Sequence, residues 1–218
     1  MFIGHFAVGF GSKRFAPSTS LATLIAAPIF LDLLWPFFVL VGIEQVRIDP
    51  GNTKLTPLDF IAYPYSHSLL MSLVWATLFA GLYFGLTRYS SGAIVVWFGV
   101  VSHWILDVLV HRPDMPLYPG GPKVGLSLWN VPALEIPLEV LMFVGGVGMY
   151  LGVTKAKDRI GRWACWTYVV ILFGFYVANL FLPPPTAVTP IVVSAIVFTA
   201  VLLVWAWWFD KHRQEPNT

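Results

Sequence analysis

Three ligand-type side chains, His103, Asp107 and His111, recur at every fourth residue within an otherwise apolar stretch. On an α-helix of about 3.6 residues per turn, this spacing places them along one stripe of the helix surface. Ile105 and Leu109 fall on the opposite side. Imidazole nitrogens and carboxylate oxygens together are the ligands that divalent transition metals take in proteins. The stretch therefore predicts a helix with metal-binding groups directed towards a polar interior.

The composition indicates what surrounds this helix. Of the 218 residues, 57% are hydrophobic and only 11% are charged, which is far too apolar for a soluble domain of this length. We therefore predict an all-α fold, a polytopic helix bundle in a lipid bilayer. The formal net charge of +2 does not indicate a basic surface for binding nucleic acid. The single cysteine, Cys165, excludes an internal disulfide and a thiolate cluster, so a metal site must use nitrogen and oxygen ligands.

About six apolar segments are long enough to cross the bilayer. They are preceded by Met1–Ser12, which is too short to span and is expected to form a half-helix. We interpret the chain as one transmembrane domain, in which residues 1–151 carry the site and residues 152–218 provide two scaffold helices and a solvated, inert tail that includes His212. The expected spans are Leu21–Ile43, Leu69–Leu86, Gly92–His111, Val131–Leu151, Trp163–Leu182 and Pro190–Phe209.

Further ligand-type side chains lie in or near the first two spans. Asp32 is about twelve residues into the first span, where a carboxylate costs about 3 kcal/mol on insertion scales and should face partners rather than lipid. His67 opens the second span, and His5 lies in the N-terminal half-helix. Taken alone, either histidine could be an ordinary interfacial residue. Their combination with Asp32 favours a shared site.

Two more acids, Glu135 and Glu139, lie four residues apart on one face of the fourth span, with Pro137 between them. Together with Asp32 and Asp107 they make four membrane carboxylates, which would cost up to about 10 kcal/mol if left bare. A tightly bound divalent ion can supply about 10 kcal/mol or more. We therefore favour a bound metal over a purely structural polar network.

The distribution of basic residues predicts the orientation. Nine of the thirteen Lys and Arg residues fall in the N-terminal segment, the loops after the second and fourth spans, and the tail. Cytoplasmic loops carry an excess of Lys and Arg, so both termini should be cytoplasmic and the site should lie in the outer half of the bilayer. The Pro- and Gly-rich segment Arg112–Asn130 would then cover the site from outside.

The motifs resemble a known family. The run Ser-His-Trp-Ile-Leu-Asp at Ser102–Asp107, the run Ser-His-Ser-Leu-Leu at Ser66–Leu70, Asp32 and His5 occur in the order seen in the LexA-regulated, inner-membrane metal-dependent hydrolases. The resemblance covers about Met1–Leu151 and implies a multi-pass protein of the bacterial inner membrane with metal-dependent hydrolase activity.

The chain departs from this family at two places. Ala62-Tyr63 stands where the family tends to have His-Arg, and Leu34 stands where a second Asp follows the first. These departures favour one metal over two. The proposed ligand pool is His5, Asp32, His67, His103 and Asp107.

The leading hypothesis is a hydrolase in which three or four of these ligands hold the metal and leave a position for water, whose pKa would fall to about 7. Glu139, Glu135 or Asp114 would act as general base, and His111 would orient a ligand or protonate the leaving group. Zinc fits the ligand types, with manganese and iron as alternatives. A site in the outer half of the bilayer suggests an amphiphilic ester or phosphoester as substrate.

Two other classes of function remain open. The same buried acids and histidines could serve an ion- or proton-coupled transporter, and spans interrupted by Pro28, Pro36 and Pro137 are compatible with one. The chain shows no internal repeat, which argues against a transporter. A membrane protein with a purely structural metal is the third reading. The sequence does not determine the substrate, the metal or the oligomeric state.

Overall fold

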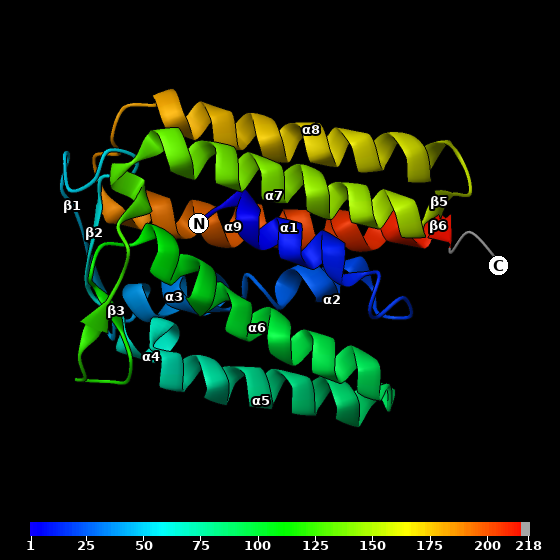
Figure 1. Ribbon diagram of the computed structural model, residues 1–218, viewed down its shortest axis with the longest axis horizontal. Coiled ribbons are helices and arrows are strands. Elements are labelled where there is room, and N and C mark those ends of the chain that lie inside the picture. Colours follow the sequence, from blue (N-terminus) through cyan, green and yellow to red (C-terminus); the bar gives the residue numbers. More distant parts are fainter. Residues whose placement is uncertain (215–218) are drawn as a thin grey trace.

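Five long apolar helices dominate the computed structural model, which describes residues 1–214. Each is long and apolar enough to cross a membrane, and Figure 1 shows them running side by side. Their bounds agree within a few residues with five of the six expected spans, which confirms the polytopic helix bundle. The helices are α5 (Leu69–Thr87), α6 (Ser90–Val110), α7 (Pro132–Val153), α8 (Arg159–Phe181) and α9 (Val188–Lys211).

The expected first span does not form one helix, so the prediction of six full spans is corrected. It divides into α2 (Leu21–Ala26) and α3 (Phe30–Leu40), with Pro28 between them. Proline has no backbone N–H and its ring clashes with the preceding turn, so it breaks the helix there. With eleven residues, α3 is about 16 Å long and cannot cross the bilayer alone.

The predicted N-terminal half-helix forms as α1 (Ile3–Ser12), which lies buried within the bundle beside α7. Gly146 permits this close approach, because a Cβ there would lie 2.2 Å from the backbone oxygen of Ala7. Gly99 of α6 has a similar role, since a Cβ there would lie 2.8 Å from the Cβ of Ala27, at the break between α2 and α3. Two glycines thus bring together the helices that carry the predicted ligands.

Short antiparallel strand pairs close the two ends of the bundle (Figure 1). At one end, the β1–β2 hairpin and the β3–β4 pair lie near the short helix α4 and the 3-10 turn η1. At the other end, β5 pairs with β6. The bounds are β1 (Gln45–Ile48), β2 (Leu58–Ala62), β3 (Met115–Pro116), β4 (Lys123–Val124), β5 (Lys155–Ala156), β6 (Arg213–Gln214), α4 (Pro64–His67) and η1 (Leu128–Asn130).

Side-chain caps begin three helices. Ser20 accepts the backbone N–H of Thr23 at the start of α2, and Ser68 caps α5 in the same way. Asp158 accepts the backbone N–H of Gly161 at the start of α8. The start of α7 has no side-chain cap, because Val131 occupies the cap position and Asn130 belongs to η1.

The tail is not inert as far as the structure describes it. Asp210 accepts hydrogen bonds from Lys13 and Tyr150, so it ties α9 to the N-terminal segment and to α7. Arg213 is buried and donates to the backbone and side chain of Thr154. His212, expected to be solvated, pairs with Asp158 at 2.7 Å. These contacts correct the prediction up to residue 214; residues 215–218 of the predicted tail lie outside the described part.

Candidate metal centre

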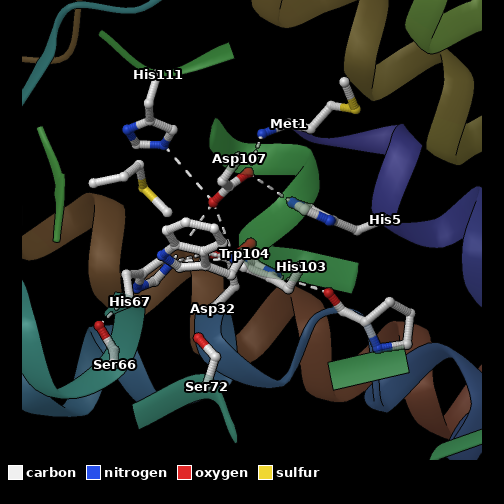
Figure 2. Close-up of polar contacts among 12 residues, drawn as sticks. Met1, His5, Asp32, Ser66, His67, Ser72, His103, Trp104, Asp107 and His111 are labelled. Atoms are coloured by element: carbon white, nitrogen blue, oxygen red, sulfur yellow. Dashed lines mark hydrogen bonds and ion pairs between the residues drawn. The ribbon is translucent and has the colours of Figure 1, made fainter. Parts of the chain in front are cut away.

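The structure brings the five predicted ligands together, although they come from four helices (Figure 2). We call His5 of α1, Asp32 of α3, His67 of α4, and His103 and Asp107 of α6 the histidine–aspartate group. All of them are buried except Asp32, whose side chain is about half exposed. The predicted proximity of these residues is therefore found, and their role as ligands stays a prediction.

The centre of this group is formed by imidazole nitrogens and carboxylate oxygens. The Nε2 atoms of His67 and His103 are 3.1 Å apart. Asp107 Oδ2 lies 3.1 Å from His103 Nε2, and Asp32 Oδ1 lies 3.4 Å from His67 Nε2. The same four side chains thus converge on one point from three helices.

The outer nitrogens of the two rings determine their tautomers. His103 Nδ1 lies 2.7 Å from the carbonyl oxygen of Pro28, which can only accept, so Nδ1 carries a proton. Ser66 donates its hydroxyl proton to Glu44 at 2.6 Å, so its oxygen accepts from His67 Nδ1 at 2.6 Å. In their neutral forms, the two rings would each direct an unprotonated Nε2 at the other. Two lone pairs at this separation call for a shared cation, and outer hydrogen bonds of this kind are typical of metal-bound histidines.

Sequence reasoning missed these outer partners. Glu44 directly follows the expected first span, and it is buried and also accepts the backbone N–H groups of Tyr65 and Ser66. The serine that directly precedes His67 was a usable signal for such a partner. No signal in the sequence indicated the carbonyl of Pro28, other than the helix-breaking proline itself.

His5 adds a third imidazole to the group. Its ring stacks on that of His103 with centroids 4.0 Å apart, and its Nε2 lies 3.0 Å from Asp107 Oδ1. Its Nδ1 has no hydrogen-bond partner among the described residues. The N-terminal ammonium group of Met1 also donates to Asp107 Oδ1 and forms an ion pair with it, at 2.7 Å.

Ligand atoms within 4.8 Å of one another define two overlapping sets that share His103. One is His5, His103 and Asp107, which is fully buried, and the other is Asp32, His67 and His103. Within residues 1–214, no Lys or Arg side chain forms an ion pair with either aspartate. The buried set could hold a metal ion, and its donor types fit a borderline cation such as zinc.

Two of the predicted catalytic residues, His111 and Asp114, adjoin the group. His111 Nε2 lies 3.7 Å from Asp107 Oδ2, and its Nδ1 lies 3.0 Å from Asp114 Oδ1. Asp114 also accepts from the Tyr63 hydroxyl at 2.7 Å and from Arg112 at 3.3 Å. Asp114 thus holds the ring of His111 in place, together with Tyr63, to which the sequence analysis gave no role.

Charge and burial determine which of Tyr63 and Asp114 donates the hydrogen bond between them. Burial alone would raise the pKa of Asp114, but the hydrogen bonds from His111, Tyr63 and Arg112 outweigh it and lower that pKa. Burial and the neighbouring Asp114 carboxylate raise the pKa of Tyr63 well above its ordinary value. Tyr63 therefore remains a neutral donor and Asp114 an ionised acceptor.

The other two predicted catalytic residues, Glu135 and Glu139, lie on α7 and are both buried. Glu139 Oε1 accepts the backbone N–H groups of Phe2 and Gly4, at the start of α1. Glu135 Oε2 has no hydrogen-bond partner within the described residues. Glu139 is therefore committed to holding α1, whereas Glu135 retains a free acceptor.

Two cavities that share part of their lining reach the group. The smaller, of about 190 Å³, is lined by Asp32, His67, Asp107 and His111. The larger, of about 810 Å³, contains Glu135 and Glu139 in its wall. Both are lined by Met1, Asp32, Trp35, Thr56, Leu58 and Trp129.

The cover over the site comes from two loops rather than one. Trp129 of the predicted cover segment lines both cavities and its ring lies 4.3 Å from that of His111. The β1–β2 hairpin contributes Thr56, Leu58 and Phe60 to the smaller cavity. Arg112 forms an ion pair with Asp59 and thereby joins the hairpin to the second loop. The sequence did not indicate the hairpin, because its polar, mixed-charge composition is typical of any exposed connection.

Comparison with known proteins identifies a family. The family model described as YdjM inner membrane protein matches residues 48–183, which is more than half of the chain. The matched range contains His67, His103 and Asp107 and extends through α8, further than the resemblance seen in the sequence; His5 and Asp32 precede it. No curated protein and no solved structure gives a significant match.

Proposed function

The chain belongs to the YdjM inner membrane protein family, and from this premise and the buried histidine–aspartate group we propose that it is a membrane-embedded metal-dependent hydrolase of an amphiphilic ester or phosphoester. The observation that carries the proposal is the pair of histidine Nε2 atoms, 3.1 Å apart and flanked by two carboxylates that lack a Lys or Arg partner among the described residues. Asp32, one of these carboxylates, lines both cavities, and the larger cavity, of about 810 Å³, is large enough for a substrate.

His103 is the ligand that both sets share in this proposal, and the other ligands come from Asp107, His67, Asp32 and His5. One ion of zinc suits these nitrogen and oxygen donors, with manganese or iron as alternatives. A divalent metal bound there supplies a Lewis acid and an activated water for attack on a carbonyl or phosphoryl centre.

The surrounding residues of the chain would handle the protons. Glu135 is the best-placed acceptor, because Oε2 is free while Glu139 is engaged by backbone N–H groups. His111 would donate to the leaving group, since Asp114 holds its ring beside Asp107. In this scheme Asp114 is a positioning residue rather than a general base.

A purified sample in lipid nanodiscs tests the activity. Chromogenic nitrophenyl esters and phosphoesters with long alkyl chains serve as probes, and the wild type loaded with zinc or manganese should hydrolyse one of the two classes. His103→Ala should be inactive, whereas the matched variant His212→Ala should keep wild-type rates, because His212 pairs with Asp158 at the other end of the bundle. A metal-loaded wild type that hydrolyses neither class, or an active His103→Ala variant, would contradict the proposal.

We also propose that both termini are cytoplasmic and that the site opens to the outer leaflet. The end that carries β5 and β6 holds nine of the thirteen Lys and Arg residues, whereas the hairpin end holds four. Lys123→Cys and Lys157→Cys, each exposed and each in a Cys165→Ser background, can be labelled on spheroplasts with an impermeant maleimide. Label at position 123 alone supports this orientation, and label at position 157 alone reverses it.

A further inference from the structure

The larger cavity is walled mainly by helices that the sequence analysis treated as scaffold. Residues 175–182 at the end of α8 and residues 191–199 in the first half of α9 supply much of its lining. Its volume of about 810 Å³ lies within the range of small-molecule sites, about 300–1,000 Å³. The apolar part of the wall includes Phe2, Phe6, Ile29, Phe175, Leu180 and Phe198.

The cavity has a polar end and an apolar end. Its polar end includes Asp32, which also lines the smaller cavity beside His67 and Asp107. The loop between β1 and β2 passes over this end with Thr56 and Leu58. The apolar end lies against α8 and α9, within two helices apolar enough to span a membrane. A ligand that fills the cavity must therefore be polar near Asp32 and apolar along α8 and α9.

The charge of the wall limits what can occupy the apolar end. Of the described residues that line the cavity, Lys54 is the one basic side chain, and it belongs to the β1–β2 loop. Three acids, Asp32, Glu135 and Glu139, also line it. An anionic group placed along α8 and α9 would meet no basic side chain among their lining residues, whereas a hydrocarbon chain would meet mostly aromatic and aliphatic side chains.

We propose that this cavity is the binding site for the acyl chain of a membrane lipid, with the lipid's ester or phosphoester group held at the histidine–aspartate group. The inference rests on the proposed function, and it assigns α8 and α9 to substrate recognition. Phe175 and Phe198, whose stacked rings have centroids 4.5 Å apart, form the contact between these two helices beside the chain.

A pair of tryptophan variants on α9 tests the assignment. Ala195 lines the cavity, so Ala195→Trp fills it, whereas Val197 is 58% exposed and does not line it, so Val197→Trp adds the same bulk to the outer surface. The probe is a lysophospholipid with a diazirine in its palmitoyl chain, photolysed in mixed micelles with the full-length protein. Adducts are mapped by peptide mass spectrometry. Metal content and melting temperature verify that each variant is folded.

The wild type and Val197→Trp should carry saturable adducts on residues 175–182 and 191–199. Ala195→Trp should reduce them about tenfold, the loss expected when a few buried methylene contacts are removed. Adducts spread evenly over the lipid-facing helices and unchanged in Ala195→Trp would overturn the inference. Because the labelling needs no turnover, saturable adducts in a protein without hydrolase activity would uphold the chain site and refute the hydrolase proposal alone. Hydrolysis of short-chain esters without such adducts would do the reverse.

Discussion

Two buried polar clusters lie at opposite ends of the bundle, and they differ in whether the protein alone completes them. At the β5–β6 end, Asp210 Oδ2 accepts from Lys13 Nζ and from the backbone N–H of Leu21, both at 2.9 Å. Its Oδ1 accepts from the Tyr150 hydroxyl at 2.8 Å. We call these residues the Asp210 cluster. Its carboxylate has three donors, one of which is a cation, so nothing further is required to neutralise it.

The histidine–aspartate group at the hairpin end is arranged differently. Apart from the Met1 ammonium group at Asp107, its two carboxylates face imidazoles, and in neutral rings the outer hydrogen bonds of His67 and His103 leave lone pairs directed at one another. Buried polar groups are normally satisfied, and an incomplete set indicates a missing partner. The comparison teaches that burial and charge alone do not distinguish a structural network from a ligand site. The positions of the protons on the side chains distinguish the two kinds of site.

Removing an imidazole from the incomplete cluster should have the largest effect. His103→Ala deletes the residue that both ligand sets share, so the variant should lose its metal and the folding free energy that the metal contributes, of which structural sites supply about 10 kcal/mol. Melting temperature with and without a chelator measures this. The wild type should melt much lower in chelator, and the variant should be unchanged by it. A chelator effect of equal size in both proteins would remove the distinction between the clusters.

Breaking the complete cluster should have a smaller effect of another kind. Asp210→Ala leaves Lys13 buried without a counter-charge, which should cost about 3–5 kcal/mol. Metal content should stay at the wild-type level, because the cluster lies at the other end of the bundle. Denaturant titration alongside metal analysis separates the two effects.

The double variant Lys13→Met/Asp210→Leu is the control for this experiment. It removes both charges and should regain most of the stability lost in Asp210→Ala. If the double variant is as unstable as the single one, the cluster acts through packing, and the contrast drawn from its charges fails.

The smallest effect is expected at the exposed pair beside the Asp210 cluster. The backbone N–H of Gly161, followed by His212, lowers the pKa of Asp158. A lowered native pKa stabilises the fold above the ordinary carboxyl pKa of about 3.9, and this contribution is lost as the pH falls through the lower native value. Asp158→Asn should flatten the acid limb of melting temperature against pH without changing metal content. An acid limb identical to that of the wild type would show that this cap contributes nothing.

Much of the fold could be predicted from the sequence, because hydropathy and length identify membrane helices almost independently of their packing. The ends of α5, α7 and α9 were located in this way. The break at Pro28 was visible as a proline, but the sequence could not show that it would divide a span into α2 and α3. Nor could it show that the released carbonyl would orient His103. That contact depends on the close approach of Gly99 to Ala27 in three dimensions.

The site was predictable in its residue types and not in its division of roles. His5, Asp32 and His67 were found because charged or ligand-type side chains are rare in membrane spans. Glu139 and Glu135 looked equivalent at a spacing of four residues, and only the position of α1 shows that one is engaged and the other free. The tail failed as a prediction because a short polar segment gives no signal for the partners that Asp210 and Arg213 find.

The most direct test of the central claim is the metal content of the wild-type protein, purified without chelator and measured by mass spectrometry of the elements. The incomplete cluster predicts about one equivalent of a transition metal per chain. That metal should be absent from His67→Ala and His103→Ala and retained in Asp210→Ala. A folded wild-type protein that contains no transition metal would contradict the account.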